Sequence, residues 1–193
     1  MKRLAICIAA GALLAGCNNN PPPPPVESAA VAVDPNNPLF APGYMTMAAS
    51  GDLFEIQSSQ LALQMSQNAA IRSFAQMLIN DHTRMSQQMM ATAQGAGLAP
   101  PPPALLPQHQ AMLDQLRATP MASFDTAFRD AQVNAHQQAL SLHQNYAASG
   151  DVPALRTLAA GAVPAIQAHL TQAQNLQVWA APPPPVARPG ERG

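Results

Sequence analysis

Apolar residues recur at intervals of three and four along the chain from about residue 44 to residue 179. A period of 3.6 residues places such positions on one face of a helix, and the chain shows no strand-like alternation. Breaks in the pattern divide it into four long segments and one short segment. We therefore expect helices over residues 44–66, 69–94, 105–117, 121–148 and 152–179.

Helix-breaking residues indicate how these helices are connected. Asn68 is the expected N-cap of the second helix, and Gly95 and Gly97 are expected to end it. The prolines at 100–103 exclude a helix there, and the connection is long enough to cross one end of a bundle. Pro164 is expected to bend the last helix. The chain thus predicts an all-α, up-down four-helix bundle with a Pro-rich connection and a short accessory helix between the second and third long helices.

The first 17 residues have the features of a bacterial lipoprotein signal. Lys2 and Arg3 precede an apolar run at 4–14, which is too short to remain as a membrane span. The run ends in Leu-Ala-Gly-Cys, which resembles a lipobox, so Cys17 is expected to carry lipid and to begin the mature protein. The alternative is an ordinary signal peptide with an incidental cysteine. Because Asn18 follows the cysteine, we expect an outer-membrane lipoprotein that faces the periplasm.

Proline-rich segments flank the expected domain. Residues 18–39 include five consecutive prolines and predict a stiff tether between the membrane and the domain. The domain itself is expected over residues 40–180. Residues 181–193, which are again rich in proline, predict a disordered tail.

The composition of the chain excludes several classes of function. Charged residues make up 10% of the chain, the net charge is −1, and Lys2 is the only lysine, so no basic patch is present for nucleic acid. The cysteines, Cys7 and Cys17, both lie in the signal segment. The expected domain therefore has no thiolate for catalysis, and any metal ligand must be His, Met or an oxygen donor.

Each long helix carries one ionisable residue on or beside its apolar face: Glu55, His82, His136 and His169. Three imidazoles and one carboxylate suit a single Zn, Fe or Cu ion, so these four residues are the predicted metal ligands. Asp81 is a candidate to orient a ligand from outside the site. The alternative is a buried polar network in which Glu55 accepts hydrogen bonds from the histidines. The sequence favours the network, because a buried polar cluster needs partners but not a metal.

Other metal chemistries have weaker support. A ferritin-type di-iron site needs a Glu three residues before its histidines, and Ile79 and Ile166 stand there instead. Methionines that follow His82 suggest a face for a soft metal, although they are more typical of core packing. These are Met85, Met89 and Met90. His109 and His143 are expected at the surface or at its boundary. His143 lies one heptad after His136 and is an alternative to it as a ligand.

Six segments of the chain resemble one bacterial family. They are AASGDLFE at 48–55, QLAL at 60–63, the stretch 74–83 with its Asp-His-Thr end, Phe-Asp at 124–125, QVNAH at 132–136 and VPAIQAHL at 163–170. Over about residues 40–178 the chain resembles the family catalogued as domain of unknown function 4142, a predicted outer-membrane protein. The resemblance implies a ferritin-like fold and a location in the envelope, but no agreed activity. The first helical turn departs from the family pattern, because Ala-Pro-Gly-Tyr at 41–44 replaces a Ser-Asp cap.

The chain is thus expected to be a lipid-anchored, ferritin-like helical bundle of the cell envelope that acts as a binding or structural module. Its partners would be the membrane, through Cys17, and an envelope protein or a second copy of the chain. The alternative is a periplasmic metal-binding protein linked to metal or oxidative stress. A third class is an enzyme that acts on periplasmic small molecules or oxidants, which no feature of the sequence positively supports. No nucleophile-elbow motif supports a hydrolase.

Overall fold

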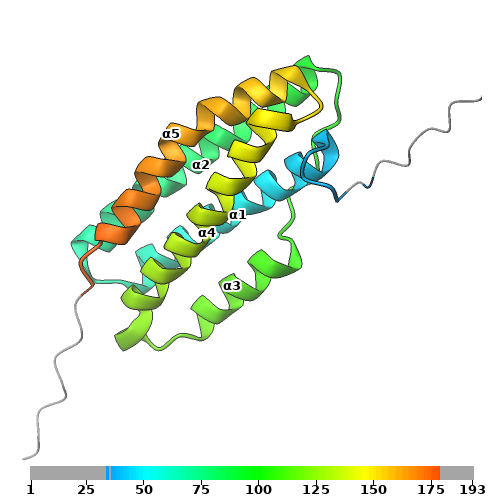
Figure 1. Cartoon of the computed structure of the whole chain (residues 1–193). Coiled ribbons are helices and arrows are strands. Elements are labelled where there is room, and N and C mark those ends of the chain that lie inside the picture. Colours follow the sequence, from blue (N-terminus) through cyan, green and yellow to red (C-terminus); the bar gives the residue numbers. More distant parts are fainter. Residues whose placement is uncertain (1–33, 35, 179–193) are drawn as a thin grey trace, which may run out of the picture. The chain divides into compact units, whose positions relative to one another are not determined.

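The computed structural model describes residue 34 and residues 36–178, which form five α-helices and no strand (Figure 1). The helices are α1 (Ala41–Met65), α2 (Ala69–Gly95), α3 (Pro107–Ala118), α4 (Met121–Ser149) and α5 (Pro153–Asn175). The all-helical prediction and the order of the elements are confirmed. The predicted signal segment, the lipidation at Cys17, most of the tether and the tail from 181 to 193 lie outside the described residues.

The local chemistry of the helix ends explains most of the boundaries. The Asn68 side chain caps α2 by accepting from the Ala70 amide at 2.9 Å. Gly97, with φ of 72°, adopts the left-handed conformation just after α2 and allows the Leu98 amide to bond back to the Ala93 carbonyl. Both caps agree with the prediction from the sequence.

Two boundaries differ from the prediction because of contacts that are distant in sequence. Helix α1 begins at Ala41 rather than near residue 44, since the Asp151 carboxylate accepts from the Ala41 amide at 2.9 Å. Helix α5 ends at Asn175 rather than near residue 179. The Gln177 carbonyl, just beyond that end, accepts from the side chain of Asn68 at 2.9 Å.

Four helices form the bundle, and α3 lies outside it against α1 and α4 (Figure 1). Around the bundle the neighbours are α1 with α2, α2 with α5, α5 with α4, and α4 with α1. The last turns of α2 and α4 pack into one apolar cluster with the first turns of α1 and α5. Helices α2 and α4 therefore run in the same direction, and the chain reaches α4 through the crossover that contains α3. One long crossover is the connectivity of ferritin-like bundles.

The apolar core consists of two clusters along the bundle axis. One lies around the start of α1 and the end of α2, and it includes Tyr44, Met89, Ala93, Tyr146, Leu155 and Ala159. The other lies toward the opposite end and includes Phe54, Leu78, Leu113, Phe124 and Phe128. Between them, each bundle helix contributes buried polar residues. The candidate site is this polar layer.

Within the described part of the chain, none of the helices is both long enough and apolar enough to cross a bilayer.

Candidate metal centre

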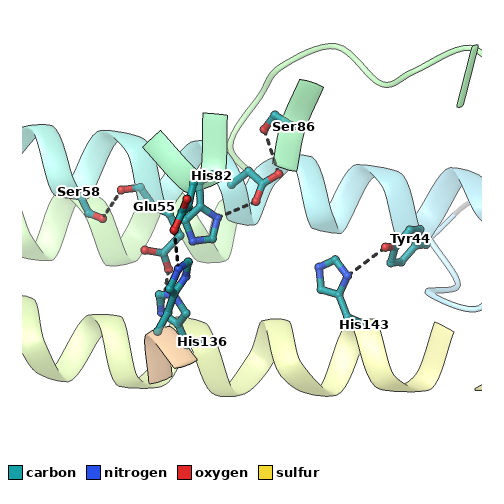
Figure 2. A network of polar contacts seen from close by, with 10 residues as sticks. Tyr44, Glu55, Ser58, His82, Ser86, His136 and His143 are labelled. Atoms are coloured by element: carbon teal, nitrogen blue, oxygen red, sulfur yellow. Dashed lines mark hydrogen bonds and ion pairs between the residues drawn. The ribbon is translucent and has the colours of Figure 1, made fainter. Parts of the chain in front are cut away.

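Three histidines from three helices meet in the polar layer. His82 lies on α2, His136 on α4 and His169 on α5, and their exposed fractions are 2%, 1% and 3%. One ring nitrogen from each lies within 4.8 Å of the others. Figure 2 shows the rings of His82 and His136 turned toward each other beside Glu55. These are three of the four residues that the sequence predicted as metal ligands.

Carboxylates outside the triad fix two of the rings. The Nδ1 atom of His82 lies 2.8 Å from Oδ1 of Asp52 on α1, and the other oxygen of Asp52 accepts from Ser86 at 2.9 Å. The Nε2 atom of His169 lies 3.0 Å from Oδ2 of Asp81. A carboxylate accepts but does not donate at neutral pH, so both of these ring nitrogens carry the hydrogen.

A backbone carbonyl fixes the third ring. The Nδ1–H of His136 donates to the Gln132 carbonyl one turn earlier at 2.8 Å. The Gln132 side chain is itself held, because its amide donates to Ser58 on α1 at 3.0 Å. Glu55 Oε1 lies 3.5 Å from the same Nδ1, so it approaches the ring on the side that already has a partner.

The remaining nitrogens of the triad have no protein partner among the described residues. They are Nε2 of His82, Nε2 of His136 and Nδ1 of His169, and all three are buried. In the neutral ring each of them carries a lone pair, because the hydrogen sits on the nitrogen that donates outward. Three lone pairs in a buried space are costly unless a proton or a cation lies between them.

Glu55 lies beside the triad without belonging to the group of converging nitrogens. It is 3% exposed, and its Oε2 has no hydrogen-bond partner within the described chain. Burial, only partly offset by the charge of His82, raises the pKa of Glu55 from 4.5 to about 8. Without a bound metal ion this carboxyl group therefore keeps its proton at neutral pH. Glu55 lies beside the centre, but it is not one of the residues whose ligand atoms lie within 4.8 Å of one another.

The surroundings of the three histidines raise the pKa of one ring and lower the pKa of the other two. Burial and the charge of His82 lower the pKa of His136 from 6.5 to about 3 and also lower the pKa of His169. Burial also opposes charge on His82, but the hydrogen bond and charge of Asp52 outweigh it and raise the pKa of His82. At neutral pH, His136 and His169 are therefore available as neutral ligands.

The distances between the histidine nitrogens become compatible with a bound metal ion if the three rings move slightly closer together. In tetrahedral coordination with Zn–N bonds near 2.1 Å, ligand nitrogens are separated by about 3.4 Å. The observed limit of 4.8 Å is wider than this. Closing the difference requires the rings to move by about 1 Å, a change that small χ rotations supply.

The sequence did not indicate the role of Asp52, and it left open which histidine Asp81 contacts. Asp52 was not considered, although it lies one helical turn before Glu55 and therefore faces the same side of α1. Asp81 was predicted to orient a ligand, and it does contact one of the histidines. That histidine is His169 on α5, not the neighbouring His82, from which a side chain at the next helical position diverges.

The prediction that His109 and His143 lie at the surface is wrong, because their exposed fractions are 6% and 7%. His109 on α3 lies 2.6 Å from the Ser50 hydroxyl and stacks on Phe54. His143 lies 3.0 Å from the Tyr44 hydroxyl, nearer the N-terminus of α1 than Glu55 is (Figure 2). Neither residue joins the triad.

Comparisons with known proteins agree with this fold. A family described as "Domain of unknown function (DUF4142)" matches residues 26–176. The solved structure "CopM in the Cu(II)-bound form" is similar, with a TM-score of 0.58 and 22% sequence identity over 68% of this chain and 91% of that one. At this identity the likeness supports the fold alone. None of the curated proteins matches the chain.

Proposed function

The chain belongs to the DUF4142 family, whose function is unknown, and we propose that it binds one transition-metal ion at His82, His136 and His169. The observation that supports this proposal is the arrangement of the ring nitrogens. Each ring has one nitrogen tied to an oxygen acceptor, and its other nitrogen is buried without a partner among the described residues. One nitrogen of each ring lies within 4.8 Å of the others. Metal-ligating histidines in proteins usually have this pattern.

A purely structural polar network accounts less well for the same residues. In such a network Glu55 would accept hydrogen bonds from the histidines. The nearest ring hydrogen, on Nδ1 of His136, instead donates to the Gln132 carbonyl, and the other ring nitrogens have no partner within the described part of the chain. A buried network that leaves the lone pairs of His136 and His169 without a partner destabilises the fold, whereas a cation bound to the histidines would satisfy them together.

The donor set favours a borderline metal ion. Three imidazoles without a thiolate suit Cu, Zn or Fe, and Glu55 or a small exogenous ligand would take the fourth position. Copper is the first metal to test, since the similar structure is of a protein in a Cu(II)-bound form. When bound, the ion would supply Lewis acidity or a redox centre, and the protein would hold it in a buried polar layer between two apolar clusters.

The test is metal content after purification without a metal-affinity column. We expect about one equivalent of metal to remain bound or to be taken up from solution. His136→Ala and His169→Ala should abolish this binding. His109→Gln removes a buried histidine outside the triad and should leave the stoichiometry unchanged. A folded protein that takes up none of Cu, Zn or Fe would overturn the proposal in favour of the polar network.

We also propose that the domain is held at the outer membrane by lipid on Cys17. The support is the basic start, the short apolar run and the Leu-Ala-Gly-Cys sequence. Cys17→Ser is expected to move the protein from the membrane fraction to the soluble periplasmic fraction of fractionated cells. Continued attachment of this variant to membranes would contradict the lipid anchor.

A further inference from the structure

Two cavities adjoin near Asp52, and the smaller one is lined by His82 of the triad. The outer one has a volume of about 650 Å³ and is lined by residues of all four bundle helices, among them Tyr44, Met89 and Leu158. The inner one is about 50 Å³, and its walls include Glu55 and His82. The inner cavity is large enough for a metal ion with a water molecule. A buried centre needs such a route to solvent if it is to load and release an ion.

The same four side chains form part of the wall of both cavities: Ala48, Asp52, Met85 and His143. We refer to these four residues as the partition. The two cavities adjoin at these residues. Ala48 is small, and the other three carry a carboxylate, a thioether and an imidazole, which are all metal-donor groups.

The orientation of these groups suits brief contact with a cation. His143 uses Nδ1 toward the Tyr44 hydroxyl, at 3.0 Å, so its Nε2 is the nitrogen left for another ligand. Asp52 adds negative charge, although both of its oxygens already accept hydrogen bonds. Met85 is half-buried and has a flexible side chain that can move aside.

One positively charged side chain lines the outer cavity and could oppose a cation. Arg84 lies in that wall, but its Nη2 is 2.7 Å from Oδ1 of Asp81. The pair cancels much of the Arg84 charge. The partition itself carries no cationic side chain when His143 is neutral, and burial lowers the pKa of His143 to about 4.

We propose that metal ions reach the triad through the partition, and that Met85 and His143 bind the ion in transit without being ligands of the final site. This inference rests on the proposed metal-binding function. The ligand class is a soft or borderline transition-metal cation, because a thioether binds Cu⁺ far better than it binds hard cations.

Transit and final binding have different kinetic consequences. A residue that contacts the ion only on the way lowers the barrier for uptake and release equally, so the dissociation constant does not depend on it. A ligand of the final site mainly slows release, and its loss raises the dissociation constant.

The experiment measures uptake and release in the metal-free protein by stopped flow, with Cu⁺ or Zn²⁺ supplied from a chromophoric chelator. Met85→Leu keeps the volume and removes the sulfur, and it should slow Cu⁺ uptake several-fold while Zn²⁺ uptake changes less. His143→Asn keeps a polar group for Tyr44 and should slow both ions. The equilibrium dissociation constant should stay the same in both variants.

Met77→Leu is the matched control, because Met77 is a partly buried methionine of α2 packed in the apolar cluster around Phe54. It should load at the wild-type rate. Wild-type uptake rates in both partition variants would overturn the inference and leave the proposed function intact. A raised dissociation constant with unchanged uptake would also overturn it, since the two residues would then be ligands. A wild-type protein that binds neither ion would refute the proposed function as well.

Discussion

At the scale of single residues, the hydrogen bond made by one nitrogen of each histidine ring determines which nitrogen is left to bind a metal ion. An imidazole that donates to a carboxylate is a stronger and better oriented ligand than one that donates to water. Asp52 has this position relative to His82 and is itself held by Ser86. In the proposed metal centre its role would be to position a ligand, and its loss should weaken binding without removing the site.

We expect Asp52→Asn to lower metal affinity by about 10–100-fold while the stoichiometry stays at one ion, because the amide keeps the shape but loses the charge. Competition against a chelator of known affinity measures the effect. Asp114→Asn, at an exposed ion pair with Arg117 on α3, is the control and should bind as the wild type does. An unchanged affinity in Asp52→Asn would refute the positioning role.

The buried carboxyl group of Glu55 predicts a pH dependence of stability in the metal-free protein. Its folded pKa, about 8, is above the unfolded value of 4.5 because of burial. Between these values the folded state binds more protons than the unfolded state, so the free energy of unfolding falls as pH rises. The loss begins above pH 4.5 and levels off above pH 8.

Glu55→Gln replaces the carboxyl by its uncharged isostere and should remove this loss. With a chelator present, the two proteins should melt at similar temperatures near pH 4.5, and the variant should be the more stable at pH 8. Thermal unfolding followed by circular dichroism over this range measures the difference. Parallel pH profiles for the two proteins would show that Glu55 is ionised in the folded state at neutral pH.

At the scale of the helices, α3 is the helix that packs outside the four-helix bundle, and one serine anchors its start. Ser50 on α1 is fully buried and accepts from the Leu106 amide at 2.7 Å. Its hydroxyl also lies 2.6 Å from Nδ1 of His109. Both contacts join α1 to the start of α3, beside the inner cavity that His109 also lines.

Ser50→Ala should cost about 1–3 kcal/mol in the free energy of unfolding, because it leaves buried partners unsatisfied. Urea unfolding measures the cost, and amide hydrogen exchange should rise first in α3. Ser141→Ala on the exposed side of α4 gains the same helix propensity and is the control, with a change within about 0.5 kcal/mol. Equal stability in both variants would mean that Ser50 does not anchor α3.

The helices themselves were predictable from the sequence because their signal is local. The 3.6-residue period and the caps at Asn68 and Gly97 depend on neighbours within a few residues. The start of α1 was not predictable, since Asp151 fixes it from 110 residues away. Likewise, the burial of His109 and His143 depends on α3 and on Tyr44, which no pattern within one helix reveals.

The candidate site shows the same division between local and distant information. His82, His136 and His169 could be chosen because each interrupts an apolar stripe, and one interior polar residue per helix predicts a shared layer. Which nitrogen faces inward could not be predicted. It depends on Asp52, Asp81 and the Gln132 carbonyl, whose positions follow from the register between helices.

At the scale of the whole molecule, the proposed centre would join helices that are otherwise connected by packing. The ligands come from α2, α4 and α5, while α1 supplies Asp52 and Glu55 beside them. The unfolded chain has no preformed site, because the three histidines of the proposed centre are separated by 54 and 33 residues (136 − 82 and 169 − 136). Binding free energy at such a site becomes folding free energy.

A bound ion should therefore raise the melting temperature. At a free ion concentration 100-fold above the dissociation constant, the gain is about 2.7 kcal/mol. For a chain of this size that corresponds to a rise of about 5–10 °C, at roughly 2–4 °C per kcal/mol. Scanning calorimetry of the metal-free protein with and without added Cu or Zn measures it, and His109→Gln should keep the full shift. His169→Ala should lose the shift because two imidazoles on α2 and α4 no longer hold α5. An equal shift in His169→Ala would show that the ion binds elsewhere on the fold.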